Sequence, residues 1–155
     1  MIEHLWRALL IVLTAATVAT AADTPEPARA MPVDRDLGEA RTRIAAKDWS
    51  GARDVMQKAV ARDPGNADYH NLLAYSIRHT ANPDMDVVFK HYGEALRIDP
   101  KHRGAHEYAG EAYLLVGNVA KAKKHLAALD KLCFFSCEEF RDLKKAVQEY
   151  EARKK

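Results

Sequence analysis

The chain has 155 residues, about the length of one domain. Its 24 Lys and Arg residues nearly balance its 22 Asp and Glu residues, which gives a formal net charge of +2, and 48% of its residues are hydrophobic. This composition excludes a disordered or collagen-like chain. The nearly balanced charge argues against a dedicated nucleic-acid binder. Two cysteines are too few for a disulfide-rich scaffold or a four-cysteine zinc site.

Residues 1–22 have the layout of a secretory signal peptide. Arg7 ends a short head, and the run from Ala8 to Ala22 contains no charged residue. The run closes with Ala19-Thr20-Ala21, which matches the A-x-A cleavage pattern, and it is shorter than the roughly 20 residues that span a bilayer. We therefore expect cleavage near Ala21/Ala22, a periplasmic or secreted protein, and no stable membrane insertion afterwards. The alternative is an uncleaved segment that is kept as an anchor.

Residues 23–34 are predicted to form a flexible linker. Pro25, Pro27 and Pro32 interrupt a stretch with little apolar bulk. From Asp34 onward the periodicity is helical, and no alternating run rich in Val, Ile and Thr indicates a strand. The predicted fold class is therefore all-α.

Three segments of the helical region share one spacing of small and large apolar residues. In each segment the last residue follows the other three by 12, 8 and 5 positions, and the last residues are 36 and then 34 positions apart. The segments are Ala52, Met56, Ala59 and Pro64; Val88, Tyr92, Ala95 and Pro100; and Ala122, Leu126, Leu129 and Phe134. A second stripe repeats between them, as Leu73, Ala74 and Ile77 and then as Ala109, Gly110 and Tyr113. Each unit therefore holds two amphipathic helices, and a proline ends the first two units because it cannot continue a helix.

With its period near 34, the pattern from Ala52 to Pro64 and the pair Gly110 and Tyr113, the chain resembles the tetratricopeptide repeat (TPR) family. The resemblance implies an α-solenoid of about three helix-turn-helix repeats, at residues 35–66, 67–102 and 103–134. Through the stretch from His102 to Tyr108, the chain is also similar to small exported bacterial proteins of this repeat type.

Residues 135–155 are predicted to form a C-terminal capping helix, the polar-faced element that a helical array needs at its end. Phe140, Leu143, Val147 and Tyr150 mark one apolar face, and the opposite face is charged. Ser136 and Glu139 fit the S-x-x-E pattern of a capping box at the start of this helix.

The TPR family binds extended peptides or partner helices on a concave face lined by the first helix of each repeat. The resemblance therefore implies that residues off the packing stripe of those helices form a partner-binding groove. These residues are Asp68, Asn71, Tyr75, Arg78, His79, Glu107, Glu111 and Leu114. We expect Glu107 and Glu111 to face solvent rather than to act as a catalytic carboxylate pair, and their charge makes a free C-terminal carboxylate an unsuitable ligand.

Cys133 and Cys137 form a C-x3-C pair at the turn before the capping helix. In an exported protein the leading interpretation is a disulfide, which would tether that helix to the last repeat. Three alternatives stay open: two thiolates that bind Cu(I), a redox-active pair with Cys137 near a helix N-terminus, or two buried free thiols.

No pattern for catalysis or metal binding accompanies these cysteines. His102 and His106 are four positions apart but lack a third ligand, so we expect surface histidines and no metal site. The chain contains no serine-histidine-acid set, phosphate loop or dinucleotide fingerprint. We therefore expect no enzyme and no cofactor.

The predicted function is an exported protein–protein interaction module, an adaptor or assembly scaffold with a protein or peptide partner and no nucleic acid. The alternative is a periplasmic thiol or copper-handling protein that uses Cys133 and Cys137.

Overall fold

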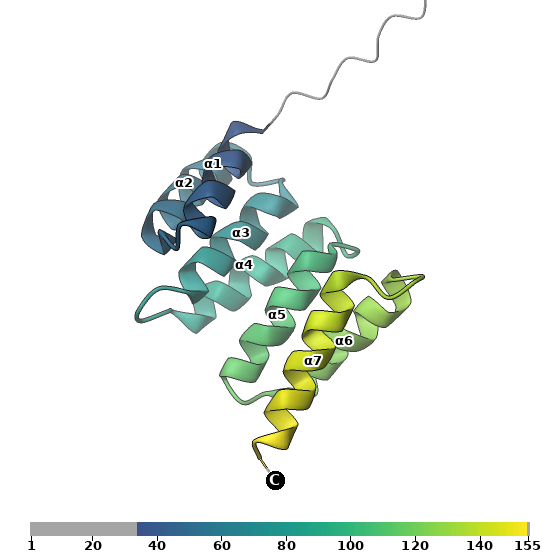
Figure 1. The fold of residues 1–155 in the computed structure, drawn as a ribbon. Coiled ribbons are helices and arrows are strands. Elements are labelled where there is room, and N and C mark those ends of the chain that lie inside the picture. The colour runs from purple at the N-terminus through teal and green to yellow at the C-terminus, as the bar shows by residue number, and fades with distance from the viewer. Residues whose placement is uncertain (1–33, 155) are drawn as a thin grey trace, which may run out of the picture. The chain divides into compact units, whose positions relative to one another are not determined.

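A computed structural model describes residues 34–154, and seven α-helices form this part of the chain (Figure 1). The helices are α1 (Arg35–Ala45), α2 (Trp49–Arg62), α3 (Ala67–Arg78), α4 (Met85–Ile98), α5 (Arg103–Leu115), α6 (Val119–Leu132) and α7 (Glu138–Ala152). The described residues contain no strand, so the predicted all-α class is confirmed. The expected signal peptide and nearly all of the expected linker lie outside the described residues, and none of the described helices has the length and hydropathy needed to cross a bilayer.

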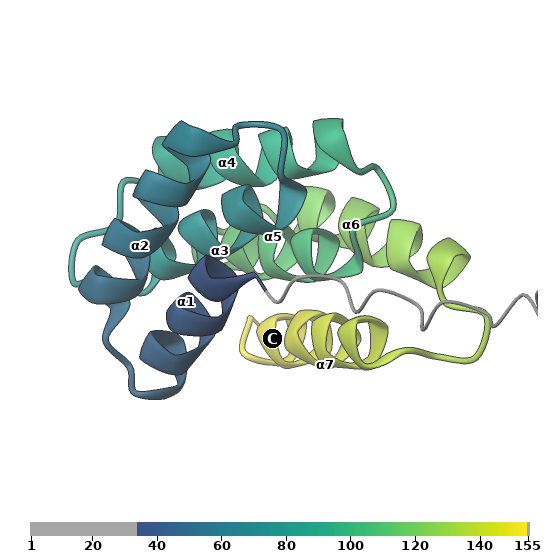
Figure 2. The same cartoon turned by 90° about the horizontal axis from the view of Figure 1, so that it is seen from above.

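The helices are arranged as antiparallel pairs whose first members form one row. In this row α1 contacts α3, α3 contacts α5, and α5 contacts α7. The second members α2, α4 and α6 each contact the helices before and after them in the chain. Figure 2 shows α1 and α7 on one side of this part of the chain, with α3 and α5 set back between them and α2 and α4 behind. The row of α1, α3, α5 and α7 therefore forms a concave face.

Side chains at the helix starts explain where most of the helices begin. A side chain just before the helix accepts hydrogen bonds from the free N–H groups of the first turn, which stabilises the end. Six of the seven described helices have such a cap, formed by Asp34, Asp48, Asn66, Asp84, His102 and Asn118. Asp34 also joins two repeats, because the Tyr69 hydroxyl donates a hydrogen bond to it over 2.6 Å.

The repeated stripes form the core, as their spacing predicts. Ala52, Met56 and Ala59 of α2 are fully buried. Their equivalents in α4 and α6 are also buried, apart from half-buried Leu126; these are Val88, Tyr92, Ala95, Ala122 and Leu129. The core divides into three clusters, each made by one helix pair and the helix that follows it. Small residues in the stripes let the helices approach closely, and the large residues fill the space between them.

Helix α7 covers the end of the array with its predicted apolar face. Leu143 is fully buried and Val147 is nearly so, in a cluster with Leu114 and Leu129. Gly110 of α5 makes this contact possible, because a Cβ there would lie only 2.5 Å from a methyl carbon of Leu143.

The predicted capping box at the start of α7 is wrong. The cap residue is Cys137, which makes no side-chain hydrogen bond to the first turn. Ser136 lies one position earlier, in a left-handed conformation with φ of 47°, so its hydroxyl is not placed to cap the helix. Glu139 does not reach back to the cap but lies 3.4 Å from Arg103 of α5.

Candidate functional site

A buried arginine lies at the centre of the concave face. Arg78, at the end of α3, forms an ion pair of 2.9 Å with Glu111 of α5, and its side chain is only 5% exposed. Its guanidinium also lies 5.2 Å from the ring centroid of Tyr75 and 5.8 Å from that of Tyr108. An arginine held by a carboxylate and two rings is fixed in place, so it gives the face a rigid centre.

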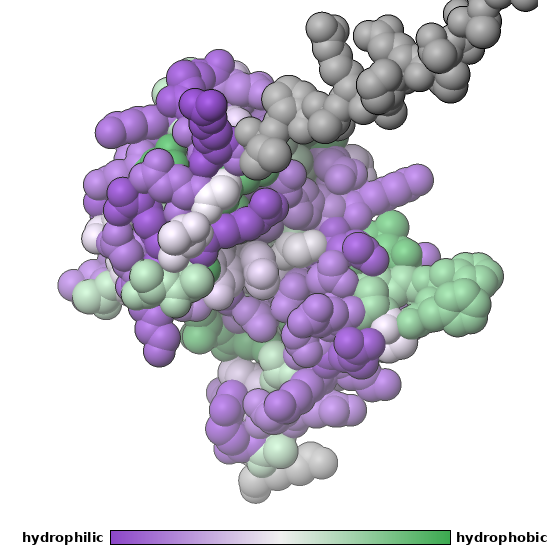
Figure 3. Space-filling model, turned by 45° about the horizontal axis from the view of Figure 1, so that its top comes forward, coloured by the Kyte–Doolittle hydropathy of each residue, from purple (hydrophilic) through white to green (hydrophobic). Residues whose placement is uncertain are grey.

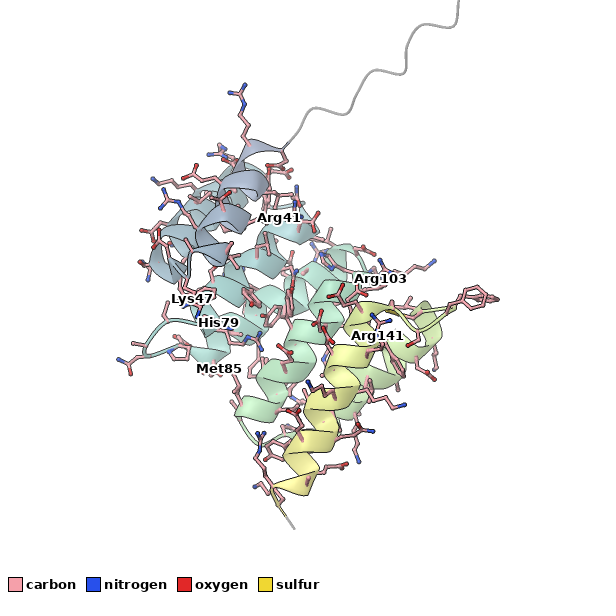
Figure 4. All side chains as sticks on the ribbon, in the orientation of Figure 1. Arg41, Lys47, His79, Met85, Arg103 and Arg141 are labelled. Atoms are coloured by element: carbon pink, nitrogen blue, oxygen red, sulfur yellow. A yellow bond between two sulfur atoms is a disulfide. The ribbon has the colours of Figure 1, made fainter. Side chains whose placement is uncertain are left out.

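Aromatic rings extend this centre toward the first repeat. The Tyr75 ring lies 4.5 Å from Tyr108 and 4.3 Å from His79, and His79 stacks on Trp49 at 4.6 Å. In Figure 4 the labelled His79 lies at the C-terminal end of α3. Four rings from α2, from α3 and the residue that ends it, and from α5 therefore form one continuous surface. We call it the aromatic cluster: Trp49, Tyr75, His79 and Tyr108.

Sequence reasoning missed two members of this cluster. Tyr108 is next to the predicted Glu107, and Trp49 begins a second helix, which the resemblance does not place on the concave face. The available signal for Trp49 was its residue type. It is an aromatic residue at the position where the other two units have Met85 and Val119.

Glu107 is buried, and the expectation that it faces solvent is wrong. Only 9% of the residue is exposed, because α7 packs beside α5. Burial, together with Glu111 and the α7 residues Asp142 and Glu139, raises the pKa of Glu107 to about 8. Its carboxyl group is therefore largely protonated at neutral pH. The neighbouring Glu111 forms its ion pair with Arg78.

Two further polar atoms on α3 have no hydrogen-bond partner among the described residues. They are Oδ1 of Asn71 and Nε of Arg78, and both are buried. Asn71 packs against the start of α5, where its amide nitrogen lies 3.4 Å from the position that a Cβ of Gly104 would take. Buried polar groups are nearly always paired in proteins, so these two atoms mark a place where the packing is incomplete.

Two hollows lie along α5, one toward each end. The first, of about 360 Å3, is lined by residues that include Asp68, His102, Gly104 and Glu139. The second, of about 450 Å3, is lined by Arg78, His79, Glu111, Leu114, Leu115, Ala146, Glu149 and Arg153. In Figure 4 the labelled Arg103 and Arg141 lie at the N-terminal ends of α5 and α7, away from the labelled His79. The first hollow lies at this N-terminal end of α5.

The eight predicted groove residues do not all lie together. Five of them lie where α3 meets α5, and His79 is next to these five. We call the five residues on the two helices the concave site: Asn71, Tyr75, Arg78, Glu107 and Glu111. Asp68 lies in the first hollow, where it contacts Nε2 of His102 over 3.2 Å, and this contact holds the pKa of Asp68 below its usual range. Leu114 lines the second hollow, but at 8% exposure it mainly packs in the core against α7.

Histidines form two equivalent pairs, and each pair joins the two helices of one repeat. Nδ1 of His70 lies 2.9 Å from Nδ1 of His91, and the same atoms of His106 and His125 are 3.1 Å apart. Nε2 of the first histidine contacts a proline carbonyl in each case, so it must carry the proton, and the second histidine donates through Nδ1. Burial, followed by the neighbouring histidine, lowers the pKa of His91 and lowers that of His125 to about 4.

The expectation that His102 and His106 are surface histidines holds only in part, because His106 is half-buried in one of these pairs and the His102 side chain is 13% exposed. His102 also has a structural role, because it accepts a hydrogen bond from the backbone of Ala105 as the cap of α5. Within residues 34–154, no group of three or more His, Cys, Asp or Glu side chains is placed to hold a metal ion.

The two cysteines lie at disulfide distance at the turn between α6 and α7. Their Cα atoms are 5.4 Å apart. This distance fits the expected disulfide, and a disulfide-bonded pair would offer no thiolate to a metal. The residues that they enclose point outward: Phe134 is 92% exposed and Phe135 89%, and Figure 3 shows a hydrophobic protrusion here.

Comparisons with known proteins support the repeat fold. No family model matches the chain. Over 78 residues the chain is 32% identical to "Inactive TPR repeat-containing thioredoxin TTL3" from Arabidopsis thaliana, a match that covers 50% of this chain but only 11% of that protein.

Solved structures give a likeness over most of the chain. The Yersinia enterocolitica type III secretion translocator chaperone SycD superposes with a TM-score of 0.67, covers 77% of this chain and 83% of SycD, and is 16% identical. SycD in complex with a peptide of the translocator YopD has a TM-score of 0.64, covers 78% of this chain and 93% of SycD, and is 17% identical. At such identities the likeness shows the fold alone, and it agrees with the antiparallel helix pairs described above.

Proposed function

We propose that this chain, which has a tetratricopeptide-like helical repeat fold, is a binding module that holds a segment of a partner protein on its concave face. The observation that carries the proposal is the aromatic cluster beside the ion pair of Arg78 and Glu111. Tyrosine, tryptophan and arginine are the side chains that most often supply binding energy at protein interfaces, because they bury a large area and lose little conformational freedom. The hollows toward the two ends of α5 give a bound segment room to continue.

The comparisons support this assignment at the level of the fold. SycD, which has a similar helical arrangement, has been solved with a peptide of its partner protein YopD. The Arabidopsis thaliana relative is described as a TPR repeat-containing protein. We extend peptide or protein binding to this chain, and we assign it no catalytic step.

We place this activity outside the cytoplasm. The support comes from the sequence of residues 1–22, with its uncharged run and the cleavage pattern at Ala19-Thr20-Ala21. A disulfide between Cys133 and Cys137 would form in that environment and would fix the start of α7. The proposed partner is accordingly a protein of the envelope or the extracellular space.

Replacing Tyr75 with alanine should abolish partner capture without unfolding the chain. Tyr75 contacts Tyr108, His79 and the Arg78 guanidinium, so its loss opens a gap in the middle of the aromatic cluster. We expect at least a tenfold loss of captured partner, in line with the roughly 2 kcal/mol or more of a central interface residue. The measurement is quantitative mass spectrometry of envelope proteins retained by the immobilised full chain. Tyr75 is preferred to Arg78, whose removal would leave Glu111 without its cation.

Phe134→Ala provides the matched control, because it removes a fully exposed ring far from the concave site in the chain. Both variants should keep the helical circular dichroism of the wild type. If Tyr75→Ala retains the same partners as the wild type, while Phe134→Ala loses them, the binding surface is the turn before α7 and the concave face is the wrong site.

A further inference from the structure

The concave site contains a buried carboxyl group that has no cation of its own. Glu107 is 9% exposed, and the only cation within the concave site, Arg78, is held by Glu111. We propose that the partner segment carries a lysine or arginine whose cation pairs with Glu107. This inference rests on the proposed function, because it names the chemistry of the segment that the concave face holds.

The position of Glu107 on α5 suits the passage of such a segment. Gly104, Glu107 and Glu111 follow one another at helical spacings of three and four residues, so they lie along one face of the helix. Gly104 lines the hollow at one end of this face and Glu111 the hollow at the other. A segment that runs along α5 from one hollow to the other therefore passes over Glu107.

Two polar side chains of the concave site, Asn71 and Glu107, have acceptor oxygens that no described residue supplies with a donor. Oδ1 of Asn71, on a residue that is 4% exposed, accepts no hydrogen bond from any described residue. Burial and three carboxylates raise the pKa of Glu107, Arg78 lowers it by less, and no hydrogen bond is among the causes of the shift. An ammonium or guanidinium group would bring several N–H donors and a positive charge to Glu107, which satisfies its carboxylate directly.

Charge in the surroundings favours a cation as well. Asp142 and Glu139 of α7 lie near enough to Glu107 to raise its pKa. Of these two carboxylates, Glu139 forms an ion pair of 3.4 Å with Arg103. The rings of Tyr75 and Tyr108 already face one cation, Arg78, and their apolar surfaces suit the methylene stem of a second.

Pairing with a cation should also change the protonation of Glu107. In the free protein its carboxyl group has a pKa of about 8, so it holds a proton at pH 7. A bound cation favours the ionised carboxylate and lowers that pKa, so binding releases a proton between the two values. Affinity for a cationic segment should consequently rise with pH up to about 8 and then level off.

The test selects peptides from a random twelve-residue library displayed on phage, at pH 8, on the full chain and on its Tyr75→Ala variant. We expect the peptides that need Tyr75 to be enriched in lysine or arginine. For a selected peptide, replacing that cation with alanine should weaken binding about tenfold or more to the wild type, but not to Glu107→Gln. Calorimetry at pH 7 in two buffers of different ionisation enthalpy should show proton release with the wild type and none with Glu107→Gln.

Glu107→Gln has nearly the shape and charge of the protonated acid, so it should fold as the wild type does. Glu94→Gln on α4 is the matched control, because it makes the same change at a residue paired with Arg97 outside the concave site, and it should leave the cation preference intact. Peptides that need Tyr75 but carry no excess of lysine or arginine would overturn this inference and leave the proposed function standing. A library that yields only peptides bound equally by Tyr75→Ala, or none at all, would overturn both.

Discussion

Replacing Leu143 with alanine should destabilise the protein by about 3 kcal/mol, within the usual range for a buried leucine. Leu143 is fully buried, and it holds α7 against α5 at Gly110. Its removal leaves a cavity that the rigid helix pair cannot close. Since α7 also carries Asp142 and Glu139, loosening this helix should change the surroundings of Glu107 in the concave site. Urea unfolding followed by circular dichroism measures the change in the free energy of unfolding.

Gly110 provides the control for this prediction. In the wild type, Gly110→Ala should destabilise, because the new Cβ would lie 2.5 Å from one Leu143 methyl carbon and 2.7 Å from the other. In the Leu143→Ala background that obstacle is gone and the added methyl group fills part of the cavity. The double variant should therefore be more stable than Leu143→Ala alone. If the two changes simply add, α7 does not pack on Gly110 in solution.

Tyr92→Ala should cost about 4 kcal/mol of stability, as expected for a large aromatic side chain in a core. Tyr92 is 1% exposed and packs in the cluster that joins α3, α4 and α5. Its hydroxyl group has no hydrogen-bond partner among the described residues. Tyr92→Phe should therefore keep or slightly raise the stability, because it removes a buried polar group that is unpaired.

The pair of Tyr92 variants separates packing from hydrogen bonding. Thermal unfolding of both proteins at the same pH is sufficient, since a 1 kcal/mol change shifts the melting temperature by several degrees in a domain of this size. A loss of more than about 1 kcal/mol in Tyr92→Phe would contradict the prediction and indicate a hydrogen-bonded water at the hydroxyl.

The sequence was sufficient to predict the fold because the repeat and the helix period are both local patterns. Ala52, Met56 and Ala59 are buried at the spacing that predicted them, and the equivalents in α4 follow the same rule. The apolar face of α7 was also correctly predicted from Leu143 and Val147. Such stripes need no knowledge of the partner helix, because a helix with one apolar face must bury it.

The details of the site depend on contacts between helices, which periodicity does not contain. Glu107 was expected in solvent, and it is buried because α7 packs beside its helix. Trp49 was missed because it reaches Tyr75 and His79 from the second helix of its own repeat. The pairing of His70 with His91 likewise joins residues 21 positions apart, a separation that only the packing of α3 on α4 brings together.

Site-specific photo-crosslinking in the native cells tests most directly whether the concave face binds a protein. Leu115 lines the second hollow and is 67% exposed, so a photo-reactive amino acid there should be tolerated. Lys58, exposed on α2 outside the concave row, is the matched position. We predict a crosslink from Leu115 to a defined segment of one envelope or secreted protein, lost in Tyr75→Ala and absent from Lys58. Equal crosslinking from both positions, or none that depends on Tyr75, would contradict a binding site on the concave face.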